Sequence, residues 1–323
     1  MSPREIVHRA IEFRGPDRVP IVYFNRDTER SDVLTANVAP AEGFVASEPG
    51  ATEWGYVWHK LDETMGQPRE APLADAQAID SYKPPDPTAP GRLDHLREFI
   101  NQGRDRFLVL GLGITGFDQA TFLRGMEQLL VDLYTDRKTA EKVLDLVFNF
   151  ENSIIEQAAA FEIDCVKFGD DWGTQRGLMI SPELWRAVFK PRYAQQFQMI
   201  HAAGKKVWFH SCGNVYPTIG DLIDIGADVL EFLQPDVMGI DNLARDFGGK
   251  VCFCCSVDHQ RVAISGSKQD IFDYAGRLIS KLGSFDGGFI ACIEDYSCLG
   301  MSEQNYQWIC EAFSTLGREK MVL

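Results

Sequence analysis

The sequence lacks any apolar run long enough to cross a membrane. A transmembrane helix needs about eighteen or more consecutive apolar residues, and no such stretch occurs. The first residues, MSPREIVHRAIEFRGPDRVP, carry charges where a secretory signal peptide needs an apolar segment. We therefore expect a soluble, cytoplasmic protein that does not bind membranes.

Basic side chains are also in short supply. The chain has 32 Lys and Arg against 47 Asp and Glu, which gives a formal net charge of −15. This balance argues against binding to nucleic acid or to anionic membrane surfaces. A strongly anionic substrate would need a local basic pocket.

The chain shows no low-complexity segment and no linker typical of a domain boundary, so we expect a single domain over residues 1–323. Eight cysteines in a long chain without an export signal are typical of free thiols or metal ligands rather than a disulfide framework. Cys165, Cys252 and Cys310 lie within apolar patterns and are expected in the core. For Cys254 and Cys255 both roles remain open.

Strand-like apolar runs alternate with amphipathic helical segments along most of the chain. This alternation predicts parallel strands with helical crossovers, and the number of strands favours a (β/α)8 TIM barrel, an α/β fold. The region 25–105 is rich in Pro and Gly and is predicted to form an irregular cover of helices and loops over the barrel mouth. The predicted strands are 19–24, 106–116, 163–171, 206–213, 228–235, 250–258 and 287–295, and the predicted helices are 121–136, 181–204, 218–226, 240–248, 268–283 and 302–317.

Polar side chains collect at the carboxyl ends of these predicted strands, where barrel enzymes carry their chemistry. His210 and Cys212 are two positions apart in an extended segment, so both project to the same side. Imidazole and thiolate together suit zinc, and a catalytic zinc site usually takes three protein ligands. A chance pair with Cys212 in apolar packing is the alternative. Candidates for the third ligand are Glu231, Cys255, His259, Cys292, Glu294, Asp295 and Cys298.

Other residues at strand ends are candidates for proton transfer or substrate contacts, and the carboxylates of Asp170 and Asp171 could transfer protons, hold a substrate amine or provide a metal ligand. Asp170 and Asp171 are adjacent in extended chain, so only one should face the mouth, and the other role for this pair is loop capping. Trp54 and Trp58 are expected either to wall the pocket or to pack in the core. Catalytic roles are predicted for Asp170, Asp171, Gln234 and Asp258, and substrate contacts for Gln260 and for Asn214, which alternatively forms a turn.

The segment FHSCGNVYPTIGDLIDIGADVLEF, residues 209–232, resembles the His-x-Cys-Gly segment of the uroporphyrinogen decarboxylase superfamily, in its zinc- and corrinoid-dependent methyltransferase branch. The resemblance extends over most of the chain, and the order of its pieces is more specific than any single motif. The supporting pieces are DRVPIVYF (17–24), GITGFDQATFLRG (113–125), FGDDWGTQRGLMISPELWRAVFKPRY (168–193), VDHQ (257–260) and GGFI with SEQN (287–305).

This resemblance implies a (β/α)8 barrel in which His210 and Cys212 match two zinc ligands. It further implies that a methyl group moves between a corrinoid (cobalamin), held by a separate small protein, and a small nucleophile. The position of the third ligand of these methyltransferases, a cysteine, falls on Asp295 here, with Cys298 as the alternative. Whether the protein forms a homodimer is left open.

The decarboxylase branch of the superfamily provides the alternative. It uses no metal and binds the carboxylates of a porphyrinogen through arginines that follow the first strand. Arg26 and Arg30 lie there, interleaved with Asp27 and Glu29, whose charges would weaken an anion site. A solvated polar loop is the other interpretation of this segment. A barrel that only binds a ligand is a third hypothesis.

Overall fold

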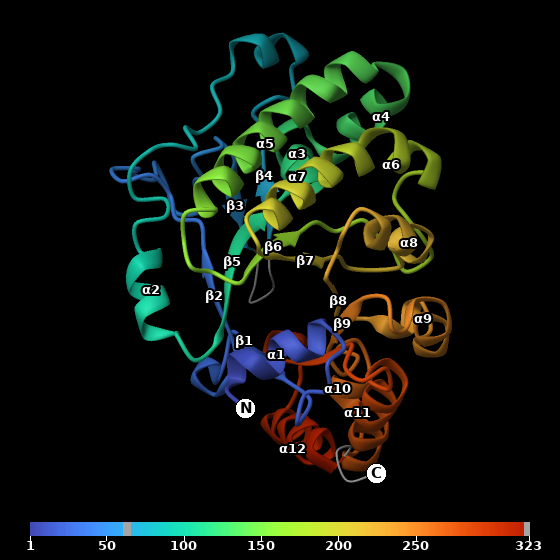
Figure 1. Cartoon of the computed structure of the whole chain (residues 1–323). Helices are drawn as coiled ribbons and strands as arrows, with labels where there is room; N and C mark the ends of the chain where they lie inside the picture. The colour runs from blue at the N-terminus through green and yellow to red at the C-terminus, as the bar shows by residue number, and fades with distance from the viewer. Residues whose placement is uncertain (61–65, 320–323) are drawn as a thin grey trace.

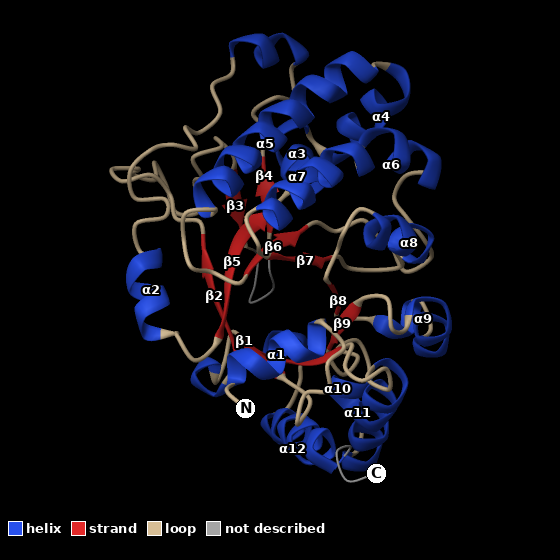
Figure 2. Cartoon of the chain, in the orientation of Figure 1, coloured by secondary structure: helices blue, strands red, loops and turns tan. Residues whose placement is uncertain are grey.

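Eight parallel strands form a nearly closed barrel in the computed structural model, which describes residues 1–60 and 66–319. Neighbouring strands follow the order β1-β10-β9-β8-β7-β6-β5-β2, and Figures 1 and 2 show them as a ring with helices outside it. The fold is thus a (β/α)8 TIM barrel. The strands are β1 (Ile21–Phe24), β2 (Val33–Asn37), β5 (Phe107–Ile114), β6 (Cys165–Gly169), β7 (Lys206–His210), β8 (Val229–Phe232), β9 (Cys252–Cys255) and β10 (Phe289–Glu294).

Helices follow the strands and cover the outside of the ring (Figure 2). Local signals in the sequence set their ends: Ser181 caps the helix that begins at Pro182 by accepting a hydrogen bond from the Leu184 N–H. The helices after β5 are α3 (Gly116–Arg124), α4 (Met126–Thr135), α5 (Arg137–Ala158), α6 (Pro182–Val188), α7 (Lys190–Ala202), α8 (Tyr216–Asp224), α9 (Ile240–Phe247), α10 (Val262–Ser265), α11 (Lys268–Leu282) and α12 (Glu303–Glu319).

The ring closes between β1 and β2 through Asp32. The Asp32 N–H donates to the Ile21 carbonyl at 2.9 Å, and the Asp32 carboxylate accepts the Ile21 N–H at 2.8 Å. Arg18 donates two further hydrogen bonds of 2.6 Å to the same carboxylate. A side chain therefore completes the seam where strand-to-strand pairing is missing.

The barrel interior is filled by alternate strand residues and closed at its amino-terminal end by helix α1 (Pro3–Ile11). Val7, Ala10 and Ile11 of α1 pack with the first inward residues of several strands, such as Phe107 and Val33. Four thiols belong to this buried interior cluster: Cys165, Cys252, Cys254 and Cys292.

The predicted strands all occur in the structure, but the region 25–105 contains the barrel strand β2, which the sequence interpretation missed. Most of the remainder of that region lies outside the ring and includes the hairpin of β3 (Val57–His59) and β4 (Gln67–Arg69) and helix α2 (Leu96–Gln102). Trp54 packs edge-on against Phe150 of α5 and Trp58 against Phe122 of α3, so both tryptophans have packing roles. Part of the predicted cover, residues 61–65, lies outside the described residues.

Two predicted helices are each divided in two. The segment 121–136 breaks at Gly125, whose φ of +89° separates α3 from α4, and the segment 181–204 breaks at Phe189 between α6 and α7. Cys165, Cys252 and Cys310 are buried as expected, and Cys254 and Cys255 are buried with them. Among the described residues, no helix is both long and apolar enough to span a membrane.

Candidate metal centre

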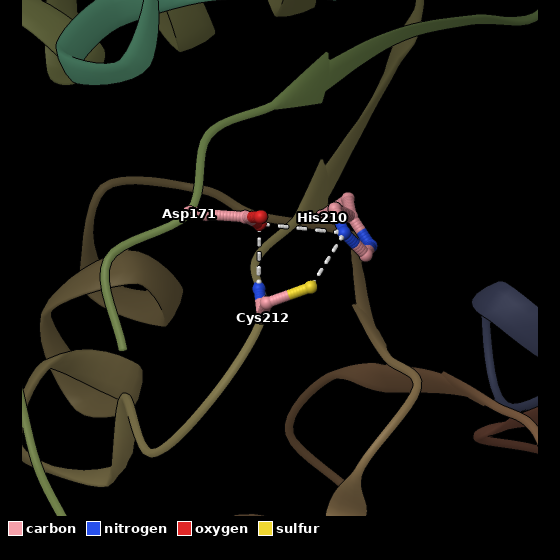
Figure 3. A group of neighbouring side chains, drawn as sticks. All are labelled: Asp171, His210 and Cys212. Atoms are coloured by element: carbon pink, nitrogen blue, oxygen red, sulfur yellow. Dashed lines mark hydrogen bonds and ion pairs between the residues drawn. The ribbon is translucent and has the colours of Figure 1, made fainter. Parts of the chain in front are cut away.

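Three potential metal ligands converge at the carboxyl ends of β6 and β7 (Figure 3). His210 is the last residue of β7, Cys212 follows in the next loop, and Asp171 lies two residues beyond β6. The Nε2 atom of His210 lies 3.5 Å from the Sγ atom of Cys212 and 3.5 Å from Oδ1 of Asp171. All three ligand atoms lie within 4.8 Å of one another.

Two of the three separations in this triad match those expected around a zinc ion. Zn–N and Zn–O bonds of about 2.1 Å and a Zn–S bond of about 2.3 Å, in a tetrahedron, place ligand atoms about 3.4 to 3.6 Å apart. The two 3.5 Å separations measured from His210 fall in that range. One nitrogen, one sulfur and one oxygen donor leave a fourth position for a reacting molecule.

Glu231 of β8 holds the other side of the His210 ring. Its Oε1 atom lies 3.0 Å from Nδ1 of His210, so Nε2 is the ring atom turned toward Cys212 and Asp171. The Glu231 carboxylate also accepts hydrogen bonds from Lys167 Nζ, at 2.7 and 2.9 Å, and from Trp208 Nε1, at 2.7 Å. A carboxylate behind a histidine ligand is a common feature of zinc sites, where it fixes the ring orientation.

The electrostatics of the centre favour a bound cation. Burial raises the pKa of the Cys212 thiol, although His210 opposes the shift. Burial disfavours a charged imidazole, yet the contacts with Cys212 and Glu231 raise the pKa of His210 above its usual value. Burial also opposes ionisation of Glu231, but Lys167 and His210 outweigh it and hold the pKa of Glu231 well below its usual range. A metal ion would supply the positive charge that keeps Cys212 as a thiolate.

Two glycines bring the loops after β6 and β7 into contact. Gly213 has a φ of +73°, and a Cβ atom added there would lie 2.2 Å from the Gly173 carbonyl oxygen. The Gly173 N–H donates to the Cys212 carbonyl at 3.1 Å, and the Cys212 N–H donates to Oδ1 of Asp171 at 2.8 Å. The close approach of the two backbones therefore places Asp171 beside Cys212.

The two adjacent aspartates after β6 have different environments. Asp170 is fully buried and accepts hydrogen bonds from the N–H groups of Phe117 and Asp118 and from the Tyr193 hydroxyl. Asp171 has 40% of its side chain exposed and faces the triad. Of this predicted pair, Asp171 lies in the site, whereas Asp170 caps the start of α3.

The sequence matches the family model described as Uroporphyrinogen decarboxylase (URO-D) over residues 61–314. The chain belongs to the URO-D family. A comparison with curated proteins finds no match. The resemblance inferred from the His-x-Cys segment is thus confirmed at the level of the superfamily.

Solved structures resemble this URO-D family barrel in fold. A methyltransferase from Methanosarcina mazei superposes with a TM-score of 0.71 at 12% identity, covering 98% of this chain and 99% of that one. Xylanase 10B from Thermotoga maritima gives a TM-score of only 0.43 at 9% identity, with 99% and 100% coverage. At 12% identity, the likeness to the methyltransferase concerns the fold alone.

The residues that the resemblance suggested as a third zinc ligand lie elsewhere in this URO-D family chain. Oδ2 of Asp295 accepts a hydrogen bond from Arg26 at 3.3 Å, and Oδ1 accepts the Ser297 N–H at 2.8 Å. Cys298 is exposed in the short helix η4 (Ser297–Leu299). Among the described residues, neither Asp295 nor Cys298 lies close enough to other potential ligands to form a metal site. The third potential ligand beside His210 and Cys212 is Asp171.

The arginines after β1 are already engaged with acidic and aromatic side chains. Arg26 makes two hydrogen bonds of 2.8 Å to Glu303, and its guanidinium lies 4.1 Å from the centre of the Tyr306 ring. Arg30 contacts Asp27 at 3.2 Å and lies over the Tyr23 ring. A substrate that binds either arginine would therefore compete with these partners.

The other predicted substrate residues lie at the rim after β8 and β9. Gln234, Asp258 and Gln260 line a hollow of about 260 Å³ together with Asp236, Val237 and Arg261. Oδ1 of Asp258 accepts the Gln260 N–H at 3.0 Å, which orders this loop. Asn214 accepts the Tyr216 N–H and donates to the Val237 carbonyl, so its contacts are those of a turn residue.

Two residues next to the triad were missed in the sequence. Lys167 is a charged residue within the otherwise buried strand β6. Because a lysine that faces a barrel interior needs a carboxylate partner, its presence could have pointed to Glu231. Asp118 accepts the Asp171 N–H at 2.9 Å, and burial, together with the nearby Asp171, raises its pKa to about 7. Its position in the first turn of α3 gave no sign of this contact.

Proposed function

We propose that this protein is a zinc-dependent methyltransferase of the URO-D family, with Asp171, His210 and Cys212 as the metal ligands. The observation that carries the proposal is the convergence of these three side chains within 4.8 Å at the carboxyl ends of barrel strands. The likeness in fold to a methyltransferase is compatible with it. Asp171 replaces Asp295 and Cys298 as the proposed third ligand.

Each residue of the centre has a distinct task in this proposal. Zinc, when bound, favours the deprotonated form of a nucleophile such as a thiol at the fourth position. Cys212 and Asp171 offset the positive charge of the ion, and Glu231 keeps Nε2 of His210 directed at it. Lys167 keeps Glu231 ionised, so that the histidine stays in one orientation.

The proposed methyl donor is a corrinoid carried by a small partner protein, and the acceptor is a small nucleophile. The nucleophile forms a bond to the methyl carbon, and the electron pair of the cobalt–carbon bond stays on cobalt. The decarboxylase alternative has less support, because Arg26 and Arg30 already pair with Glu303 and Asp27. A porphyrinogen carboxylate would have to compete with those acids.

Metal analysis of the purified protein tests the metal centre. We expect close to one zinc per chain, and we expect His210→Ala, Cys212→Ala and Asp171→Asn each to lower zinc affinity by roughly tenfold to a hundredfold or more. Asp295→Asn and Cys298→Ser are matched controls that should retain zinc. If Asp295→Asn loses zinc while Asp171→Asn retains it, the ligand assignment is wrong.

The reaction is tested by following the absorbance of methylcobalamin mixed with the protein and a small thiol. Wild-type protein should demethylate the corrinoid, and the three ligand variants should not. A zinc-free, folded protein that decarboxylates a porphyrinogen and loses that activity in Arg26→Ala would instead favour the decarboxylase.

A further inference from the structure

An aromatic ring and a carboxylate lie side by side at the barrel mouth, across from the metal ligands in the ring of strands. Phe24 ends β1 and Glu294 ends β10, and the two residues are directly paired in the sheet register. Both have the same parity as Val22 and Cys292, which pack in the barrel interior, so both side chains belong to the inner face. Phe24 is nonetheless 47% exposed. A large apolar ring on the inner face that remains open to solvent is available to a ligand.

Lys167 joins this pair to the metal centre. Its Nζ atom lies 5.5 Å from the centre of the Phe24 ring and 2.7 Å from the Glu231 carboxylate, which in turn lies 3.0 Å from His210. Phe24 therefore faces the same interior space as the zinc ligands. A molecule resting on Phe24 can extend toward the fourth position of the proposed metal ion.

Formal charges leave Glu294 without a counter-ion in this space. The charges of Lys167 and Glu231 cancel, and a zinc ion cancels those of Cys212 and Asp171. No cation of the described residues makes an ion pair with Glu294, whereas Asp295, the next residue, pairs with Arg26. Burial raises the pKa of Glu294, and a hydrogen bond with Tyr296 and the charges of His210 and Lys167 only partly offset that shift.

We propose that Phe24 and Glu294 bind the alkylammonium group of a small substrate whose separate nucleophilic group, such as a thiol, reaches the fourth position of the metal ion. A cation that lies on an aromatic face and beside a carboxylate gains from both, most strongly when little water surrounds it. The inference rests on the proposed function for the position of the reacting centre. If Glu294 instead ligated a metal or transferred a proton, the neighbouring Phe24 ring would have no part in its function. An effect of Phe24 on binding therefore distinguishes cation recognition from those two roles.

Binding of tetramethylammonium, followed by ligand-observed NMR, tests the inference with tert-butanol as the neutral probe of similar size. Wild-type protein should bind the cation in preference to the alcohol. Glu294→Gln should weaken binding of the cation roughly tenfold and Phe24→Leu roughly threefold, without changing the weak response to the alcohol. Glu303→Gln, which removes a rim carboxylate paired with Arg26, is the matched control and should bind as the wild type does.

Zinc content and thermal unfolding are measured on the same samples. Equal binding of both probes, or tetramethylammonium binding unchanged in Glu294→Gln, would overturn the inference, and so would loss of zinc in Glu294→Gln. Glu294→Asp retains the negative charge, so it should bind tetramethylammonium more tightly than Glu294→Gln does. That result would show that the loss in Glu294→Gln comes from the missing charge and not from misfolding. If the protein binds tetramethylammonium but no zinc, the proposed function is wrong and this inference holds. If it binds zinc but not tetramethylammonium, this inference is wrong and the proposed metal centre holds.

Discussion

At the residue scale, Asp170 and Asp171 are adjacent and have opposite surroundings. The buried carboxylate of Asp170 satisfies two backbone N–H groups and the Tyr193 hydroxyl, whereas Asp171 lies half-exposed beside His210 and Cys212. Asp170 thus stabilises the start of α3, and Asp171 is free to contact a metal ion. A substitution at either position should therefore affect a different property of the protein.

Asp170→Ala should lower the free energy of unfolding by about 3 kcal/mol, because three buried donors lose their acceptor. Asp171→Ala should cost about 1 kcal/mol or less in metal-free protein and should remove zinc binding. Urea unfolding and metal analysis of the two variants check this. Equal destabilisation by the two substitutions would contradict the assignment.

The spacing of His210 and Cys212 made that pair predictable, because residues two apart in an extended segment share a side, although Cys212 lies in the loop just after β7. The choice between Asp170 and Asp171 was not predictable in this way. It depends on how the chain turns after β6, where Asp170 accepts the N–H groups of α3 and so directs Asp171 toward β7. Contacts between separate elements of this kind leave no pattern in one segment of sequence.

At the element scale, the loops after β6 and β7 form one unit through the contact of Gly173 and Gly213. Gly213→Ala should lower zinc affinity by tenfold or more and destabilise the fold by roughly 1 to 3 kcal/mol. Its positive φ disfavours a side chain, and the added Cβ would collide with the Gly173 carbonyl. Gly177→Ala in the loop after β6 is the control, because a Cβ there meets no atom within 4 Å. Zinc titration of both variants decides the matter, and similar affinities would count against a positioning role for the glycine contact.

The apolar strands were predictable from their composition, but β2 was not. Its sequence VLTAN is short, and only Val33 of its five residues is fully buried. The strand also follows directly on the polar segment 25–32, so periodicity gave no clear signal. The contact of Asp32 with Ile21, where a carboxylate replaces strand pairing, was likewise not predictable from the sequence, because it depends on how the first two strands meet.

At the scale of the whole molecule, Glu151 links three helices and makes stability depend on pH. Its carboxylate on α5 accepts the Gly116 N–H of α3 and the Gln196 side chain of α7, and burial raises its pKa to about 7 from 4.5. The folded state therefore retains a proton that the unfolded state releases between these values. Stability contributed by this group is greatest below pH 4.5 and declines as pH rises to about 7.

Glu151→Gln should remove this part of the pH dependence and stabilise the protein at pH 8 by roughly 1 to 3 kcal/mol. The new amide can accept the Gly116 N–H and donate to the Gln196 side-chain oxygen, which lacks a hydrogen-bond partner in the described structure. Urea unfolding of both proteins at pH 5 and pH 8 measures the difference. A variant less stable than the wild type at pH 8 would show that Glu151 is ionised without penalty.

Helix α1 closes the amino-terminal end of the barrel, so molecules reach the metal ligands through the opposite, carboxyl-terminal opening. If the methyl carrier is a protein, it and the small molecule share that single entrance. The small molecule then has to enter before the carrier docks, and the methylated product leaves only after the carrier departs. Steady-state kinetics should accordingly show a compulsory order of addition, with excess carrier protein inhibiting turnover.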